Sequence, residues 1–259
     1  MIWITGASSG IGEALAYALA GKNNFLILSA RREDQLERVK NQCPSQSHGG
    51  IYLLPLDLAA APAISKKVEE ALKWKGHIDV LINNGGISQR GLAKDTVLDV
   101  DRRIMEVNYF GTIALTKAVL PGMIERRSGH IVVNTSITGK FSTPLRSSYA
   151  ASKHALHGFF DALRAELFDH DIKVTILAPG FVKTDITLHA LTNEGKAFNK
   201  MGEAQAAGMK VATCARKMIR AIEREKEEVY IGGKEVYAVY LKRFFPGLFS
   251  KMVRKAKVT

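Results

Sequence analysis

Cysteine is scarce in this sequence, which holds only Cys43 and Cys214. The two lie far apart and belong to no CxxC motif or Cys/His cluster. This excludes a small disulfide scaffold and speaks against a zinc site or a redox motif. We therefore expect a reducing compartment and predict no metal site.

Long apolar runs are missing as well. No uncharged apolar stretch approaches the roughly 18 residues that a membrane-spanning helix needs. The N-terminus enters a strand-like run at once, so no signal peptide is expected. Hydrophobic residues make up 46% of the 259 positions and charged residues 24%, which is ordinary globular composition and excludes disorder and collagen. A cytoplasmic protein is expected.

The chain has 25 acidic residues against 37 lysines and arginines, and much of this excess of positive charge lies near the C-terminus. Residues 234–259 hold seven basic residues and one acid, Glu235, and so contribute +6 of the net +12. Apolar residues recur between these charges at helical spacing. The pattern predicts one or two amphipathic helices, which either rest peripherally on an anionic membrane or, as we favour, pack on the protein. No nucleic-acid motif is present, so nucleic acid is not an expected partner. The seven basic residues are Lys234, Lys242, Arg243, Lys251, Arg254, Lys255 and Lys257.

Short apolar runs alternate with longer helical patterns along most of the chain. This alternation indicates a parallel sheet covered by helices on both faces. Right-handed crossovers favour one Rossmann-type, doubly wound α/β sheet of seven strands. We predict a single domain over residues 1–233, followed by the basic amphipathic tail, residues 234–259. The expected strands are Ile2–Thr5, Phe25–Ala30, Ile51–Leu56, Ile78–Asn83, His130–Thr135, Ile172–Leu177 and Glu228–Ile231.

Helices are expected between these strands, including a long one from about Leu98 to Ile124 and another over Tyr149–Phe168. Residues 186–210 are polar and dotted with glycine, without a strong period. We expect this segment to be a mobile insertion, which either covers a substrate pocket or is only a long surface connection.

The turn after the first strand reads Thr5-Gly6-Ala7-Ser8-Ser9-Gly10-Ile11-Gly12, with the spacing G-x-x-x-G-x-G. Small residues let the backbone approach a pyrophosphate at a helix N-terminus, where free N–H groups favour negative charge. Ser8 and Ser9 can add hydroxyl donors. The turn therefore predicts a dinucleotide site, although glycine also serves tight packing between a strand and a helix.

The second strand ends in Ala30, Arg31 and Arg32. A carboxylate at this point would accept hydrogen bonds from an adenosine ribose and repel a 2′-phosphate. Guanidinium groups instead suit a phosphate monoester. We therefore predict that NADP(H) is preferred over NAD(H); the alternative is that both arginines only begin a solvated helix.

Polar or flexible residues follow the third and fourth strands: Asp57-Leu58, and Asn83-Asn84-Gly85-Gly86. Ligands of open α/β sheets bind at the carboxyl ends of strands. Asp57 could accept a hydrogen bond from the adenine amino group, and the Asn-Gly-Gly turn would let adenosine lie against the backbone. Each segment alone is also an ordinary turn signal.

Tyr149 and Lys153 lie four residues apart and share one helix face. A tyrosine with a pKa near 10 is a poor acid–base group at neutral pH, and a nearby ammonium lowers that pKa. Ser136 ends the fifth strand and can reach the same sheet edge. Asn108 is a polar residue inside an apolar helix pattern.

Taken together, these segments resemble the short-chain dehydrogenase/reductase family from Ile2 to about Gly233. The NNGGxSQR run over residues 83–90 and the LSARR strand end are most similar to the membrane-associated branch related to dehydrogenase/reductase member 7. This chain has Gly85 where the family usually has alanine. The matching segments are TGASSGIG (5–12), Asp57-Leu58, NNGG (83–86), Asn108, Ser136, YAASK (149–153) and Pro179–Thr184.

The resemblance implies that Tyr149 is the general acid/base and that Ser136 positions the carbonyl group. It implies that Lys153 binds the ribose and lowers the pKa of Tyr149. Asn108 would support a water-linked proton relay to Lys153. Residues after the sixth strand would contact the nicotinamide and a phosphate. The predicted cofactor-binding residues are Gly6, Ser8, Ser9, Gly10, Ile11, Gly12, Arg31, Arg32, Asp57, Leu58, Asn83, Gly85, Tyr149, Lys153, Pro179, Val182 and Thr184.

The sequence thus predicts an NADP(H)-dependent enzyme that interconverts a ketone or aldehyde and an alcohol. The alternatives are an NAD(H)-dependent oxidation of a secondary alcohol and a catalytically weak dinucleotide-binding scaffold or sensor. A homodimer or homotetramer is expected, as in the family. Ile87, Gln89, Phe141, Leu145 and residues 186–210 are expected around the substrate, which suggests a partly apolar ketone, lipid or steroid-like molecule.

Overall fold

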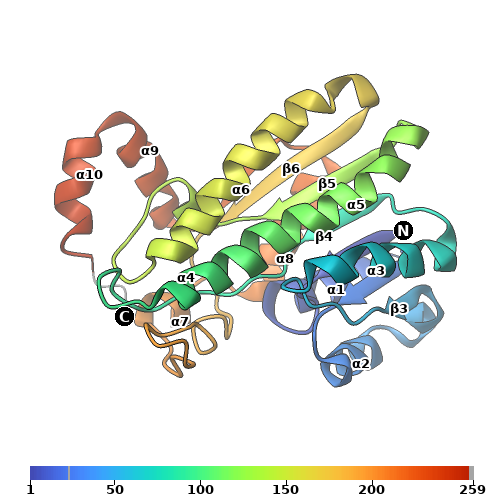
Figure 1. The fold of residues 1–259 in the computed structure, drawn as a ribbon, viewed down its shortest axis with the longest axis horizontal. Coiled ribbons are helices and arrows are strands. Elements are labelled where there is room, and N and C mark those ends of the chain that lie inside the picture. Colours follow the sequence, from blue (N-terminus) through green and yellow to red (C-terminus); the bar gives the residue numbers. More distant parts are fainter. Residues whose placement is uncertain (23, 257–259) are drawn as a thin grey trace.

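A computed structural model describes residues 1–22 and 24–256; Asn23 and residues 257–259, with Lys257 of the predicted basic tail, lie outside the described part. Its centre is one parallel seven-stranded sheet, as predicted (Figure 1). The strands follow the order β3-β2-β1-β4-β5-β6-β7. The order reverses between β1 and β4, which is the switch point of a doubly wound fold. The strands are β1 (Ile2–Thr5), β2 (Leu26–Ser29), β3 (Ile51–Leu53), β4 (Val80–Asn83), β5 (Gly129–Asn134), β6 (Ile172–Pro179) and β7 (Glu228–Ile231).

Neighbouring residues of each inner strand belong to different cores. Trp3, Ile27 and Leu81 face one core, whereas Ile4 and Leu28 face the other. Successive side chains of a strand point to opposite faces, so an uninterrupted apolar run is what a sheet buried on both sides requires.

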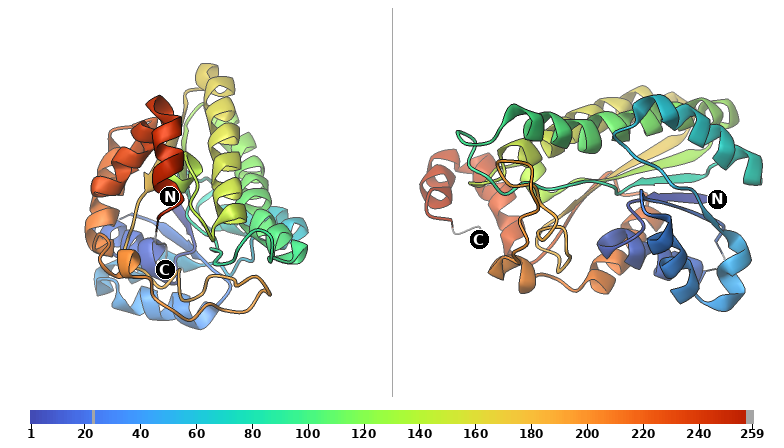
Figure 2. Two further views of the ribbon diagram at one scale, coloured as in Figure 1. Left: turned by 90° about the vertical axis from the view of Figure 1, so that its left-hand side faces the viewer. Right: turned by 60° about the horizontal axis from the view of Figure 1, so that its bottom comes forward.

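Helices supply the other half of each core, and Figure 2 shows the sheet between two helical layers. One layer consists of α3 (Ala61–Lys75), α5 (Gly111–Arg126) and α6 (Ser147–Glu166). The other consists of α1 (Gly10–Ala20), α2 (Glu33–Gln42) and α8 (Val211–Glu223).

Strand β3 ends at Leu53, three residues before the predicted end. Hydrogen bonding to β2 nevertheless continues past this residue, because Leu54 N donates to Leu28 O and Leu56 N donates to Ala30 O, each at 3.0 Å. Pro55 lies between these two donors, where an N–H would point away from β2 on this edge strand, so the proline costs the sheet no hydrogen bond.

The long helix expected from about Leu98 to Ile124 is interrupted. Helix α4 (Leu98–Met105) runs into a π-helical turn, Glu106–Phe110, which leads into α5. The turn contains Asn108, whose side chain is fully buried. Wide turns of this kind often occur at functional sites.

The segment 186–210 lies across the carboxyl end of the sheet and includes the short helix α7 (Glu203–Ala206). Its backbone is tied to the segment after β4: Leu191 N donates to Ser88 O at 2.9 Å, and Arg90 N donates to Leu191 O at 2.8 Å. Of the two alternatives for this segment, the structure favours a cover over the site.

The C-terminal tail forms α9 (Tyr237–Phe244) and α10 (Pro246–Val253), two short helices at the same end of the molecule as α7 (Figure 1). Val239 and Phe249 are buried and form a third apolar cluster with Ile137 and Phe141. The tail therefore packs on the body along one side. Within residues 1–22 and 24–256, no helix is both long and apolar enough to cross a bilayer.

Candidate active site

The glycine-rich turn leads into α1 with a backbone that suits an anion. Gly6 and Gly10 have φ values of +63° and +58°, a region that side chains with a Cβ rarely adopt. The Ser9 hydroxyl forms no cap hydrogen bond to α1. The first-turn N–H groups therefore remain available for a phosphate oxygen.

Gly12 serves the close packing beneath this turn. A Cβ at Gly12 would lie 2.2 Å from Gly6 O and 2.6 Å from Asn84 Nδ2. The predicted cofactor contact of Gly12 is therefore indirect, because this glycine lets α1 approach the strand that carries the turn.

Asn84, and not the predicted Asn83, holds the turn in place. The Asn83 amide donates to Thr116 Oγ1 of α5 at 3.0 Å, away from the cleft. The Asn84 amide donates to Thr5 O at 3.0 Å and accepts from Asn134 Nδ2 at 2.8 Å. This bridge joins the ends of three neighbouring strands, β1, β4 and β5.

A cleft of about 420 Å³ starts at this turn and passes over the ends of β2 and β3. Ala30 stands at the carboxyl end of β2, and the exposed Arg31 and Arg32 follow it. Asp57 Oδ1 accepts from Ala59 N at 3.0 Å and Leu58 packs in the core, so these residues shape the adenosine side. The predicted residues that line this cleft are Gly6, Ser8, Ser9, Gly10, Ile11, Arg31, Arg32, Asp57, Leu58, Gly85 and Thr184.

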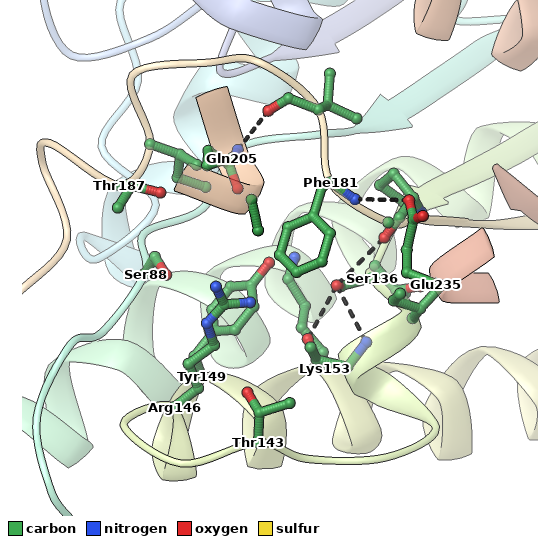
Figure 3. Close-up of a pocket in the computed structure, with 18 of the residues that line it drawn as sticks. Ser88, Ser136, Thr143, Arg146, Tyr149, Lys153, Phe181, Thr187, Gln205 and Glu235 are labelled. Atoms are coloured by element: carbon green, nitrogen blue, oxygen red, sulfur yellow. Dashed lines mark hydrogen bonds between the residues drawn. The ribbon is translucent and has the colours of Figure 1, made fainter. Parts of the chain in front are cut away.

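A second cavity of about 370 Å³ adjoins the first. It contains the predicted Ser136, Tyr149 and Lys153 (Figure 3). Pro179 and Val182 line it from the segment that follows β6. The two spaces are continuous, because they share the lining residues Ile11, Asn84, Gly86, Ser88, Asn134, Thr184 and Ile186.

The Ser136 hydroxyl is held at the end of β5. Its Oγ accepts hydrogen bonds from Thr138 N at 3.1 Å and from Thr138 Oγ1 at 2.9 Å. The hydroxyl itself lies 3.4 Å from Pro179 O, a long contact that a stronger acceptor can replace. Ser136 can therefore donate to an oxygen in the cavity.

Tyr149 and Lys153 come from the first two turns of α6. Lys153 is 5% exposed, and its Nζ donates to Asn134 O at 3.0 Å and lies 5.8 Å from the centre of the Tyr149 ring. Burial lowers the pKa of Lys153 to about 8. Burial raises the pKa of Tyr149, against the opposing effects of Arg146, Ser136 and Arg90. At neutral pH Tyr149 is therefore protonated, and Lys153 is mostly charged.

Asn108 reaches the site from the π-helical turn. Its Oδ1 accepts from Ile87 N at 2.8 Å, and its Nδ2 donates to Ile87 O at 2.9 Å and to Ser152 Oγ at 3.0 Å. The side chain thus fixes the backbone just after the Asn-Asn-Gly-Gly turn. A Cβ at Gly86 would lie 3.0 Å from Asn108 Oδ1 and 3.7 Å from Lys153 Nζ, so Asn108 and Lys153 are close neighbours.

Four further residues of the cavity walls were not among the predicted site residues. Asn84 and Asn134 could have been suspected, since each follows or ends a strand at the sheet edge that carries the site. Arg90 ends the run over residues 83–90 that carries part of the resemblance, but neither Arg90 nor Arg146 was expected at the cavity, because isolated arginines are usually exposed. Conversely, Gln89 was expected at the substrate, but its side chain binds Thr96 Oγ1 and Ser148 N inside the fold.

Comparisons with known proteins agree with this geometry. Residues 1–195 match the family model of short chain dehydrogenases. A dehydrogenase/reductase SDR family protein 7-like from Anopheles gambiae is 44% identical over 98% of this chain and 82% of its own length. Dehydrogenase/reductase SDR family member 7B from Bos taurus is 42% identical over 98% of this chain and 80% of its own length.

Solved structures show the same likeness. A short-chain dehydrogenase from Streptomyces avermitilis superposes with a TM-score of 0.80 at 27% identity, covering 98% of this chain and 95% of the other. An alcohol dehydrogenase from the archaeon Thermococcus sibiricus, complexed with 5-hydroxy-NADP, gives a TM-score of 0.76 at 25% identity, covering 90% and 96%.

Proposed function

The chain belongs to the short-chain dehydrogenase/reductase family of oxidoreductases, and on that premise we propose that it interconverts a ketone or aldehyde and an alcohol with NADP(H) as cofactor. One observation carries the proposal: Ser136, Tyr149 and Lys153 meet in a cavity that is continuous with the dinucleotide cleft. A carbonyl carbon beside Tyr149 would therefore lie next to the nicotinamide end of the cofactor.

The residues present fit a nicotinamide dinucleotide. The uncapped start of α1 suits its pyrophosphate. Arg31 and Arg32 line the adenosine end, and no carboxylate stands at Ala30 to repel a 2′-phosphate. This charge distribution supports NADP(H) over NAD(H).

When bound, the reduced nicotinamide supplies a hydride to the carbonyl carbon and is oxidised. Ser136 donates a hydrogen bond to the carbonyl oxygen and orients it. Tyr149 gives its hydroxyl proton to the same oxygen, which completes the alcohol. Lys153 stabilises the phenolate left behind, because its positive charge lies beside the ring. Asn108 holds the Ile87 backbone and lies next to Lys153, where it supports the return of a proton.

The alternative is a scaffold that binds a dinucleotide and turns over little. The two are separated by a screen of aldehydes, ketones and secondary alcohols, each with NADP(H) and with NAD(H), followed by the absorbance of the reduced nicotinamide. Turnover of carbonyl compounds with NADPH is expected. Tight NADPH binding without turnover of any compound would favour the scaffold.

A homodimer or homotetramer is proposed as the assembly. Phe160 and Leu163 on α6 are buried in the core of the chain itself, so they are not available for a contact between subunits. Phe110 at the start of α5 is 47% exposed and offers an apolar contact on the same layer. Light scattering during gel filtration gives the number of subunits.

We also propose that the tail touches an anionic membrane. Val239 and Phe249 pack inward, yet other apolar side chains of α9 and α10 remain exposed among basic residues. Aromatic rings beside lysine and arginine are typical of the membrane interface. The exposed apolar residues are Tyr237, Tyr240, Phe244, Phe245, Leu248 and Met252.

The full chain is expected to sediment with vesicles that contain phosphatidylserine, and only partly to release as the salt concentration rises. Charge attraction is screened within about 10 Å at 0.1 M salt, whereas inserted rings resist salt. Replacing Phe244 and Phe245 together by serine should abolish the salt-resistant fraction. These two side chains are 69% and 62% exposed, so the fold should persist.

Phe168→Ser is the matched control, because this phenylalanine is 81% exposed but lies after α6, outside the tail. Equal losses in both variants, or a full chain that ignores vesicles, would contradict membrane contact. A change in subunit number in the tail variant would instead assign the exposed rings to a contact between copies.

A further inference from the structure

Two buried arginines line the substrate cavity next to Tyr149. Arg90 is 6% exposed and Arg146 is 7% exposed. Figure 3 shows Arg146 beside the tyrosine, with Ser88 and Thr187 on the same side. A guanidinium stays charged at neutral pH, so this side of the cavity carries two positive charges.

Neither arginine has an acidic partner within residues 1–22 and 24–256. Arg90 donates to Gln89 O at 2.8 Å and to Thr187 Oγ1 at 3.3 Å, both of them neutral. The Arg146 side chain donates no hydrogen bond within this part of the chain, and its guanidinium carbon lies 5.7 Å from the Phe181 ring centre. The Nε groups of both arginines and the Thr143 hydroxyl are buried and find no hydrogen-bond partner among the residues that the structure describes.

Such an arrangement is unfavourable unless an anion completes it. Buried charges are normally paired, because removing them from water is costly. Burial lowers the pKa of Arg90 to about 10, with Arg146 adding to the effect, and burial lowers the pKa of Arg146 as well. Both groups nevertheless remain protonated at pH 7, and each repels the other.

The acidic residue that lines the same cavity does not fill this role. Glu235 accepts from Phe181 N at 3.2 Å and from Gly233 N at 3.0 Å. Figure 3 places it on the far side of Ser136 from Arg146. Tyr149 is protonated, so it offers no negative charge either.

We propose that the substrate is a carbonyl compound with an acidic group, a carboxylate or a phosphate monoester, which binds between Arg90 and Arg146. The inference rests on the proposed carbonyl chemistry and specifies its substrate class. Guanidinium groups bind both anions through paired, charge-assisted hydrogen bonds. The buried donors Thr143 Oγ1, Arg90 Nε and Arg146 Nε gain the partner that they lack.

The anion would also fix the orientation of the substrate. With the acidic group at the arginines, the carbonyl oxygen is directed to Ser136 and Tyr149. The rest of the molecule meets an apolar wall that includes Phe141 and Phe249, which pack with ring centres 5.3 Å apart. Binding of the acidic group, at a distance from the carbonyl carbon, thus helps to orient the carbonyl group for reaction.

Matched substrate pairs test the proposal on the full chain with NADPH. The first pair is a medium-chain keto acid and its methyl ester; the second is a hydroxyketone phosphate and the free hydroxyketone. A set of keto acids that differ by one carbon between carbonyl and carboxylate finds the best spacing. We expect kcat/KM about tenfold or more higher for the charged member of at least one pair. The pair whose charged member has the higher kcat/KM shows whether the site prefers a carboxylate or a phosphate. Esters and free hydroxyketones that react as fast as their charged partners overturn the proposal.

Arg146→Gln removes the charge and keeps a polar side chain of similar reach. The ratio of kcat/KM for the acid over its ester should fall by about tenfold, and Arg146→Lys should restore part of it. Arg102→Gln is the control, because its side chain is 70% exposed on α4, and it should leave the ratio unchanged. If Arg146→Gln slows acid and ester equally, the arginine is structural and the proposal fails.

The anion site can also be tested by ligand binding to the unmodified protein. This measurement needs neither turnover nor a variant, so it does not depend on whether a variant folds. A medium-chain alkanoate and an alkyl phosphate should raise the melting temperature of the NADPH complex more than the corresponding alkanol does. Equal shifts contradict the anion site. Turnover of neutral ketones without any preference for acids leaves the proposed function standing and refutes this inference. Anion binding without any carbonyl turnover would instead support the anion site and contradict the proposed function.

Discussion

Replacing Tyr149 with phenylalanine is expected to lower kcat/KM for carbonyl reduction by at least about a hundredfold. The ring that packs beside Lys153 stays, but the hydroxyl proton that completes the alcohol is lost. Burial keeps this tyrosine protonated at neutral pH, so it is ready to act as an acid. Steady-state rates with the best carbonyl substrate from the screen, measured with NADPH, give the result.

NADPH affinity should remain within a few-fold of the original, because the dinucleotide cleft is untouched. Tyr52→Phe is a matched control: it also removes a phenol hydroxyl, which donates to Glu70 Oε1 at 2.9 Å at the far edge of the sheet. A Tyr149→Phe protein with near-normal rates would remove the acid/base role and point to the scaffold alternative.

Arg31→Ala should weaken NADPH binding by about ten- to a hundredfold and change NADH binding far less. A charge-assisted hydrogen bond to a phosphate is worth about 1.5–3 kcal/mol, and only NADPH carries the 2′-phosphate. Arg31 is exposed at the adenosine end of the cleft, so its removal should leave the core intact. Fluorescence titration with both cofactors measures the two affinities.

Arg220→Ala, an exposed arginine in the last turn of α8, is the control for a general loss of positive charge. The difference between the cofactors should also shrink as salt rises, because exposed charges are screened. Equal losses for NADPH and NADH would show that Arg31 does not read the 2′-phosphate.

The strands were predictable because their signal is local. A run such as Ile2–Thr5 is apolar on both faces, and only a sheet covered on both sides accommodates it. Strand ends were harder to predict: β3 ends at Leu53 although Leu54 and Leu56 still donate to β2, and β6 runs two residues further than expected, to Pro179. The π-helical turn around Asn108 could not be predicted from the spacing of apolar residues, because that spacing indicates an ordinary α-helix.

The candidate site was predictable where a motif places several groups at once. Tyr149 and Lys153 share a helix face, and the glycine turn opens a helix after a strand. Arg90 and Arg146 could not be found this way, because their burial results from segments that are distant in the chain. Asn83 and Asn84 also look alike in sequence, and only the alternation of strand side chains decides which one points to the cleft.

Phe249 on α10 closes part of the substrate cavity, although every segment that shapes the dinucleotide cleft precedes β7. The molecule therefore separates two tasks along its chain. The strands before β7 and the turns that follow them shape the dinucleotide cleft, while the two C-terminal helices bound part of the volume left for the other reactant. A change in α10 would therefore alter the walls of the substrate cavity and leave every residue that lines the dinucleotide cleft in place.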